Sequence, residues 1–260
     1  MHYNHIILTR FNLQYEKDNT IHICTEWLEE RFRLFESYCL PSVTRQTSQK
    51  FTWVILASDQ TPDIYKKRLA EYRIQHENID IQFCPYFEDI NQLYQAIGQH
   101  YCLGYDHLLS TRLDSDDMLA LDFIEKLQSH ITPQTQSHTI LSFHSGIQWF
   151  ETRNISLSAS YKKNHFLSFY EPIEHIRTCI GINHTEVPNN LLAGLEEIDW
   201  PESTKEIQRN WIGKSEGMEI SFDIVDNSGN KLTSASVRPS SVFSIPVIAP
   251  ALLKVNAYPK

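Results

Sequence analysis

Short apolar runs alternate with segments of helical periodicity through the first half of the chain. The runs are rich in residues typical of strands, and most are followed by apolar residues recurring every three or four positions. The predicted strands are residues 5–8, 51–56, 79–84, 107–110 and 139–143. This succession is typical of βαβ units, so we predict an α/β fold with a mostly parallel sheet flanked by helices.

The periodicity weakens after the fifth predicted strand, and a polar stretch continues to about residue 190. Beyond it, residues 218–224 alternate between apolar and polar as a strand does, and residues 226–230 are typical of a hairpin turn. We therefore predict a main domain over residues 1–190 and a small β-rich segment over residues 191–260.

Polar side chains follow three of the predicted strands. Thr9 and Arg10 follow the first, Asp59 follows the second, and the acidic turn 114–117 follows the fourth. Ligands of open parallel sheets bind beyond the carboxyl ends of the strands, where these side chains converge. We expect a nucleotide along this edge, with its base near Asp59 and its diphosphate near Asp114 and Asp116.

The acidic turn consists of Asp114, Ser115, Asp116 and Asp117. Two carboxylates separated by one residue can reach a single hard cation, so Asp114 and Asp116 are the predicted ligands of Mn²⁺ or Mg²⁺. Such an ion stabilises the charge on a departing nucleoside diphosphate, which gives Asp116 a catalytic role. The simpler interpretation is that Asp116 or Asp117 is the N-cap of a helix that begins near Leu119. The two interpretations can coexist if Asp117 is the cap while Asp114 and Asp116 hold the metal.

Composition and charge narrow the class of protein. The net charge of −9 argues against nucleic acid as a partner, and the five cysteines form no C-x-x-C pair, so we predict free thiols. The chain has no stretch of eighteen apolar residues, which is about the length needed to span a bilayer. Its first residues have neither the basic region nor the apolar core of a signal peptide. We expect a cytoplasmic protein, with peripheral attachment to the inner membrane left open.

Four segments in the same order resemble a known family. They are TRFN (9–12), WLEERFRLFESYCLPSVTRQT (27–47), FTWVILASDQTP (51–62) and LLSTRLDSDDMLALDFIEKLQ (108–128). Over residues 5–185 the chain resembles the bacterial putative rhamnosyltransferases, glycosyltransferases of the GT-A type. The resemblance implies a dTDP- or UDP-sugar as the donor, with dTDP-rhamnose as the specific expectation. It also implies a saccharide or lipid-linked saccharide as the acceptor, in polysaccharide biosynthesis.

The resemblance also implies roles for individual residues. Asp59 would contact the base or ribose, and Arg112 would add positive charge near the phosphates. Glu171 would lie on the acceptor side as the general base of an inverting displacement, although a solvated loop glutamate is an equal alternative. His184 would complete the metal site, while His144 is expected to line the pocket or to form an internal hydrogen bond.

The tail resembles a different protein. Over about residues 195–250, and most clearly at 200–205 and 208–217, it is similar to the ribbon that enters the editing domain of leucyl-tRNA synthetase. The threonine-rich T-T-R-P-D-T of that enzyme is replaced by SVRPSS at 236–241, and no H-I-G-H or K-M-S-K-S signature is present. Aminoacylation is therefore excluded, while a natural fusion, a remnant and an artificial join stay open.

The leading hypothesis is a metal-dependent enzyme that transfers a hexose from a nucleoside diphosphate sugar to a saccharide. A sugar-nucleotide hydrolase or a nucleotidyltransferase could use the same edge and the same acidic turn. The alternative outside enzymes is an inactive glycosyltransferase-like binding module.

Overall fold

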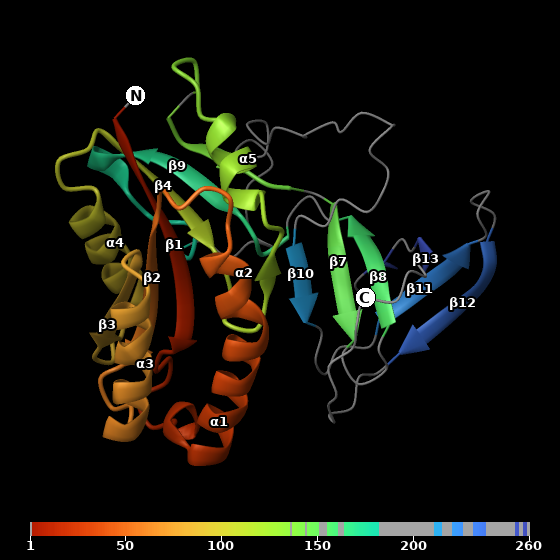
Figure 1. Ribbon diagram of the computed structural model, residues 1–260, viewed down its shortest axis with the longest axis horizontal. Coiled ribbons are helices and arrows are strands. Elements are labelled where there is room, and N and C mark those ends of the chain that lie inside the picture. The colour runs from red at the N-terminus through yellow and green to blue at the C-terminus, as the bar shows by residue number, and fades with distance from the viewer. Residues whose placement is uncertain are drawn as a thin grey trace.

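The structure is a computed structural model. It describes residues 2–135, 137–143, 145–150, 155–160 and 164–181, and strand segments at 211–214, 220–225, 231–237, 253–254 and 257–258. Helices flank the larger sheet, and the shorter strands of the later part of the chain lie beside this α/β unit (Figure 1).

The larger sheet has six strands in the order β3-β2-β1-β4-β9-β6. Their bounds are β1 (Tyr3–Asn12), β2 (Thr52–Ser58), β3 (Ile79–Cys84), β4 (His107–Arg112), β6 (Thr139–Leu141) and β9 (Ser168–Pro172). The first four strands are parallel, and β9 runs antiparallel to both of its neighbours. The mostly parallel α/β sheet predicted from the sequence is confirmed.

Helices cover both faces of this sheet. They are α1 (Thr25–Leu34), the π-helical turn η2 (Phe35–Cys39), α2 (Leu40–Thr44), α3 (Asp63–Gln75), α4 (Ile90–Tyr101) and α5 (Phe123–Ser129), with 3₁₀ turns η1 (Ile21–Ile23) and η4 (Ile173–His175). Strand β1 shows why two layers form, because its side chains alternate between the faces. Ile7 packs with residues of α1, α3 and α5, whereas Ile6 and Leu8 pack with residues of α4.

Two further sheets contain the remaining strands. The five-stranded sheet has the order β13-β8-β7-β10-β5, and the three-stranded sheet has the order β12-β11-β14. Their bounds are β5 (Met118–Leu119), β7 (Ser145–Phe150), β8 (Ile155–Ser160), β10 (Trp211–Lys214), β11 (Ile220–Val225), β12 (Lys231–Val237), β13 (Leu253–Lys254) and β14 (Ala257–Tyr258).

The predicted boundary at residue 190 lies outside the described residues, as does most of the segment that resembles leucyl-tRNA synthetase. Both therefore stay predictions. Among the helices that the structure describes, none is long and apolar enough to cross a membrane.

Candidate functional site

A cavity of about 410 Å³ opens where β1 ends beside the acidic turn. Its walls come from the end of β1, the segment that follows it, the helix α1 and the turn itself. The lining includes Arg10, Asn12, Tyr15, Glu16, His22, Trp27, Arg31, Asp114, Ser115 and Asp116. The cavity thus lies at the carboxyl edge of the parallel strands, where ligands of such sheets bind.

The acidic turn is anchored to the strands on both sides of it. The Asp117 amide donates to the Asp114 carbonyl at 3.1 Å, which closes the turn, and the Leu113 amide donates to the Leu8 carbonyl at 3.1 Å. The Arg112 amide donates to the Leu167 carbonyl at 2.9 Å, next to β9. These backbone bonds hold the aspartates in a defined position at the end of β4.

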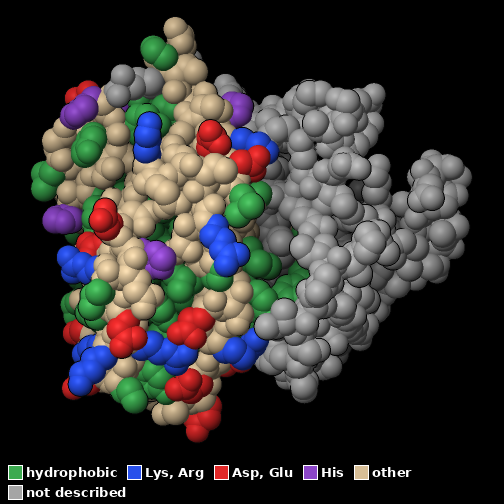
Figure 2. Space-filling model, viewed as in Figure 1, with side chains coloured by type: hydrophobic (Ala, Val, Ile, Leu, Met, Phe, Trp, Pro, Cys, Tyr) green, Lys and Arg blue, Asp and Glu red, His purple; other side chains and the backbone are tan. Residues whose placement is uncertain are grey.

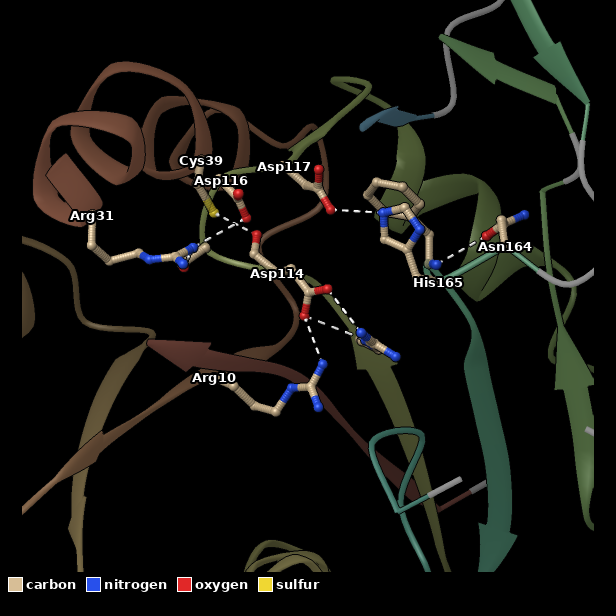
Figure 3. Close-up of polar contacts among 11 residues, drawn as sticks. Arg10, Arg31, Cys39, Asp114, Asp116, Asp117, Asn164 and His165 are labelled. Atoms are coloured by element: carbon tan, nitrogen blue, oxygen red, sulfur yellow. Dashed lines mark hydrogen bonds and ion pairs between the residues drawn. The ribbon is translucent and has the colours of Figure 1, made fainter. Parts of the chain in front are cut away.

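Asp114 lies between two arginines (Figure 3). Its carboxylate oxygens are 3.2 Å from Arg10 Nη2 and 2.8 Å from Arg112 Nη2. Burial by itself raises the pKa of Asp114, but the Arg112 and Arg10 guanidinium groups outweigh it and hold that pKa well below its ordinary value. Asp114 is therefore ionised at neutral pH, and it pairs with Arg10 at the cavity wall and with Arg112 outside the cavity lining.

Asp116 is paired with an arginine that the sequence analysis did not identify. Arg31 Nη1 is 3.3 Å from Asp116 Oδ1 and donates to Ser115 Oγ at 2.9 Å. The Arg31 guanidinium also lies 4.8 Å from the centre of the Trp27 ring, one helical turn earlier on α1. The spacing of Trp27 and Arg31 was the available signal, because residues four apart share one helix face.

Asp117 points away from the other aspartates and contacts His165 (Figure 3). His165 Nε2 is 2.8 Å from Asp117 Oδ2, and only 4% of the Asp117 side chain is exposed. Burial raises the pKa of the Asp117 carboxyl to about 6. Burial opposes protonation of His165, but the Asp117 carboxylate outweighs it and raises the pKa of that imidazole.

The N-cap prediction for Asp117 is wrong. The chain forms the short strand β5 after the turn, and α5 begins only at Phe123 with Asp122 at its N-cap position. Instead, Asp117 ties the acidic turn to the segment before β9. Asn164 fixes that segment, because its Nδ2 donates to Ser142 Oγ at 2.9 Å and to the Phe143 carbonyl at 3.0 Å.

Two residues predicted to bind the nucleotide lie away from the cavity. Thr9 is completely buried, and its hydroxyl oxygen accepts a hydrogen bond from Trp53 Nε1 at 2.8 Å. Asp59 is exposed at the end of β2 and is absent from the residues that line the cavity. The structure therefore brings together Arg10, Asp114 and Asp116, with Arg112 behind Asp114, but it adds neither Thr9 nor Asp59 to this group.

Glu171 also lies apart from the acidic turn. It pairs with Leu108 on β4, whereas Thr111 at the far end of that strand pairs with Ser168. Three residues of strand separate these pairs, a distance of about 10 Å.

The contacts of Glu171 are structural. The side chain is completely buried, and its two oxygens accept hydrogen bonds from the Arg177 and Thr178 amides, each at 2.9 Å. Burial raises the pKa of Glu171 to about 7, although the two amides favour the ionised form. This placement does not support the prediction that Glu171 is the general base, because Glu171 does not line the cavity and both of its oxygens accept backbone hydrogen bonds.

The predicted metal site stays a prediction. Within the described part of the chain, no group of three or more His, Cys, Asp or Glu side chains is arranged to hold a metal ion. Both oxygens of Asp114 contact arginines. The side chain of Asp116 is 26% exposed in the cavity, so it could share an ion with the phosphates of a substrate, as Mg²⁺ sites commonly do. His184 and His144 lie outside the described residues.

Comparison with solved structures gives distant similarities. A crystal structure of S. aureus TarS 1-349 is 13% identical with a TM-score of 0.32, and covers 58% of this chain and 35% of the TarS chain. The TarS 1-349 complex with UDP is 16% identical with a TM-score of 0.27 and the same coverage. The chain thus spans about a third of the length of these TarS structures.

A putative nucleotide-diphospho-sugar transferase from Desulfovibrio desulfuricans G20 is 13% identical with a TM-score of 0.34. This match covers 70% of this chain and 65% of the other.

The comparison with family models is decisive for the family. The model described as "Putative rhamnosyl transferase" matches residues 5–198, about three quarters of the chain. The match includes the whole cavity and the acidic turn. The chain therefore belongs to the putative rhamnosyl transferase family, a family of glycosyltransferases.

Proposed function

We propose that the protein transfers a hexose, rhamnose in the simplest case, from a nucleoside diphosphate sugar to a saccharide or lipid-linked saccharide. The observation that carries this proposal is the cavity itself. It places Arg10 beside Asp114 and Arg31 beside Asp116 at the carboxyl edge of a parallel sheet. Membership of the rhamnosyl transferase family agrees with this reaction. We further propose the GT-A type, because the acidic turn follows β4, which lies beside β1 in the parallel part of the sheet.

The reaction needs a site that stabilises the nucleoside diphosphate as it leaves. Arg10 is one such group, because Asp114 holds its guanidinium at the cavity wall. Arg112 is less exposed, at 12% of its side chain, and it fixes Asp114 from the other side. Preorganised positive groups of this kind stabilise developing charge without reorganising during the reaction.

A divalent ion is part of the proposal. Asp116 would hold Mn²⁺ or Mg²⁺ together with phosphate oxygens of the donor, and the ion would supply Lewis-acid stabilisation of the diphosphate. Asp114 takes a supporting role, because its contacts with Arg10 and Arg112 occupy both of its oxygens.

Calorimetric titration with UDP and dTDP, with and without Mn²⁺, tests the proposal. We expect binding that strengthens with Mn²⁺ in the parent protein and is lost in the Asp114→Ala, Asp116→Ala double variant. The exposed Asp63 at the start of α3 gives a matched control, and Asp63→Ala should bind as the parent does. A folded parent that binds neither nucleotide would contradict the proposal.

A donor labelled in its sugar separates transfer from hydrolysis. A transferase requires the saccharide acceptor for release of the nucleoside diphosphate, whereas a hydrolase releases free sugar without it. Free sugar as the main product at every acceptor concentration would favour the hydrolase.

A further inference from the structure

Arg31 connects helix α1 to the acidic turn across the cavity. It contacts two consecutive residues of the turn, with Nη1 2.9 Å from Ser115 Oγ and 3.3 Å from Asp116 Oδ1. About a quarter of its side chain, 24%, is exposed, and it lines the cavity together with Asp116. Figure 3 shows its long side chain reaching from α1 toward the turn.

A metal ion held by Asp116 would meet the Arg31 guanidinium, which already contacts that carboxylate. A guanidinium and a divalent cation compete for the same carboxylate, because each brings positive charge to it. If a cation and the donor bind at Asp116, Arg31 loses its partner and needs another anion within reach. A phosphate oxygen bound to the same cation meets this need, because arginine matches the geometry of phosphate with two parallel hydrogen bonds.

Trp27 limits where the guanidinium can move. The Arg31 guanidinium lies over the Trp27 ring at 4.8 Å from its centre, and both residues line the cavity. The attraction between a cation and an aromatic face keeps the guanidinium on this side of the cavity when its carboxylate partner is lost. The movement from Asp116 to a phosphate is then a short pivot over the ring.

We propose that Arg31 pairs with Asp116 in the free enzyme and transfers to a phosphate of the nucleoside diphosphate when the donor and metal bind, with Trp27 as its positioning residue. This inference rests on the proposed function and deepens it, because it assigns a phosphate-binding residue and a place-holding role to a side chain outside the acidic turn.

The first test compares UDP with uridine by calorimetric titration in the presence of Mn²⁺. Arg31→Gln should weaken UDP binding by about tenfold to a hundredfold, the usual effect of losing a hydrogen bond to a charged group. Uridine binding should be unchanged, because uridine has no phosphate. The UDP affinity of Arg31→Lys should lie between those of the parent and Arg31→Gln, because lysine keeps the positive charge but lacks the two parallel hydrogen-bond donors.

The second test uses Mn²⁺ alone and has the opposite expected sign. Without nucleotide, Arg31→Gln should bind Mn²⁺ more tightly than the parent, because the competing guanidinium is gone. Substitution of a residue with a merely structural role would weaken the binding of both Mn²⁺ and UDP. Weaker Mn²⁺ binding in Arg31→Gln would therefore overturn the place-holding role.

Two more variants complete the experiment. Arg33 lies on the same helix and pairs with Glu30 at 2.8 Å outside the cavity, so Arg33→Gln should bind UDP as the parent does. Trp27→Leu should weaken UDP binding by about twofold to fivefold, the usual size of a cation–π contribution at a partly exposed site. An equal loss in Arg33→Gln and Arg31→Gln would show a general effect on α1 and overturn the inference.

Failure of this inference differs from failure of the proposed function. If the parent binds UDP with Mn²⁺ and Arg31→Gln binds it equally well, only the role of Arg31 is overturned. If the folded parent binds neither UDP nor dTDP, the proposed function itself fails, and the inference fails with it.

Discussion

His5 is a buried histidine at the centre of a hydrogen-bonded series of side chains that joins β1, β4 and α5. Gln128 Nε2 donates to His5 Nδ1 at 3.0 Å, so the ring proton lies on Nε2, which donates to Thr111 Oγ1 at 2.9 Å. Burial lowers the pKa of His5 to about 3. The imidazole is therefore neutral in the folded protein across the physiological range.

This burial predicts a pH dependence of stability. Below about pH 6.5 a histidine in the unfolded chain binds a proton that folded His5 does not bind, so the contribution of His5 to stability is lost as the pH falls. Relative to His5→Gln, the unfolding free energy of the parent should fall by up to about 1.4 kcal/mol per pH unit between about pH 6 and 4. Urea unfolding at several pH values measures this difference.

The exposed His100 on α4 supplies the control for this prediction. His100→Gln should show the same pH slope as the parent. Parallel slopes for the parent and His5→Gln would contradict the assignment of the slope to His5.

Glu171 supports a turn that has an unusual backbone. Thr178 has a φ of 66°, in the left-handed region of backbone conformation that residues other than glycine rarely adopt. Its amide donates to the Glu171 carboxylate. In Glu171→Gln, the side-chain NH₂ group would face one of the two backbone N–H donors, and neither group can accept a hydrogen bond from the other. The substitution should therefore lower the free energy of unfolding by about 1–3 kcal/mol. Urea unfolding measures the cost, and exposed Glu174→Gln is the control, expected within about 0.5 kcal/mol of the parent.

The same variant also tests the general-base prediction. Because Glu171 lies away from the cavity, Glu171→Gln should keep the nucleotide affinity and the transfer rate of the parent at a temperature where both are folded. A rate that falls by several orders of magnitude without loss of fold would restore Glu171 to the mechanism.

The sequence locates site residues where a motif and a strand end coincide. Arg10, Asp114 and Asp116 were found because each comes soon after a predicted strand, and the direction of parallel strands places them together. Arg31 and His165 were missed because each lies far along the chain from the turn that it contacts. Thr9 and Asp59 also come after predicted strands, but the Thr9 side chain is buried in the core and Asp59 lies outside the cavity.

At the scale of elements, α4 packs against the segment after β9 through a glycine. A Cβ added at Gly98 would lie 2.3 Å from Ile176 Cγ2 and 2.7 Å from Thr178 Cγ2. Gly98→Ala should therefore destabilise the protein by about 1–3 kcal/mol through overpacking, although alanine favours a helix by about 1 kcal/mol. Thermal or urea unfolding measures whether the substitution lowers or raises the free energy of unfolding.

Gln99 is the neighbouring control, because it is exposed on the same helix. Gln99→Ala should be neutral or slightly stabilising. If Gly98→Ala were as stable as Gln99→Ala, the close approach of α4 to Ile176 would not constrain the fold.

The helix after β1 shows how local sequence signals can mislead. Pro41 predicts a helix end, yet the helical segment continues to Thr44. The π-helical turn Phe35–Cys39 precedes the proline, so Pro41 lies in the first turn of a new α-helical segment, where a missing amide hydrogen is tolerated. Apolar periodicity identifies the buried face correctly, but it does not reveal this change in helix type.

In the six-stranded sheet, the parallel strands could be predicted from the sequence and the antiparallel strand β9 could not. Strand β9 lies in a stretch that looks polar and loop-like, but it inserts between β4 and β6 in the sheet. Its place depends on pairing with β4, more than fifty residues earlier in the chain, and no local pattern encodes such pairing. Figure 2 shows acidic and basic side chains intermixed on the described face.

Ligand binding should appear as a change in the stability of the whole protein. A nucleotide that binds only the folded state stabilises it by about 2.7 kcal/mol when its free concentration is a hundred times the Kd. For a chain of this size that corresponds to a rise in Tm of roughly 5–10 °C. We expect UDP or dTDP with Mn²⁺ to produce this rise in the parent and in Asp63→Ala, and scanning fluorimetry measures it.

The Asp114→Ala, Asp116→Ala double variant should lack this rise. The cavity joins β1, α1 and the end of β4, so a ligand that bridges Arg10 and Arg31 resists the separation of elements that are far apart in the sequence. An equal rise in the double variant would place the nucleotide elsewhere on the molecule. A rise with Mn²⁺ alone, of the same size as with nucleotide, would mean that the metal rather than the diphosphate supplies the stabilisation.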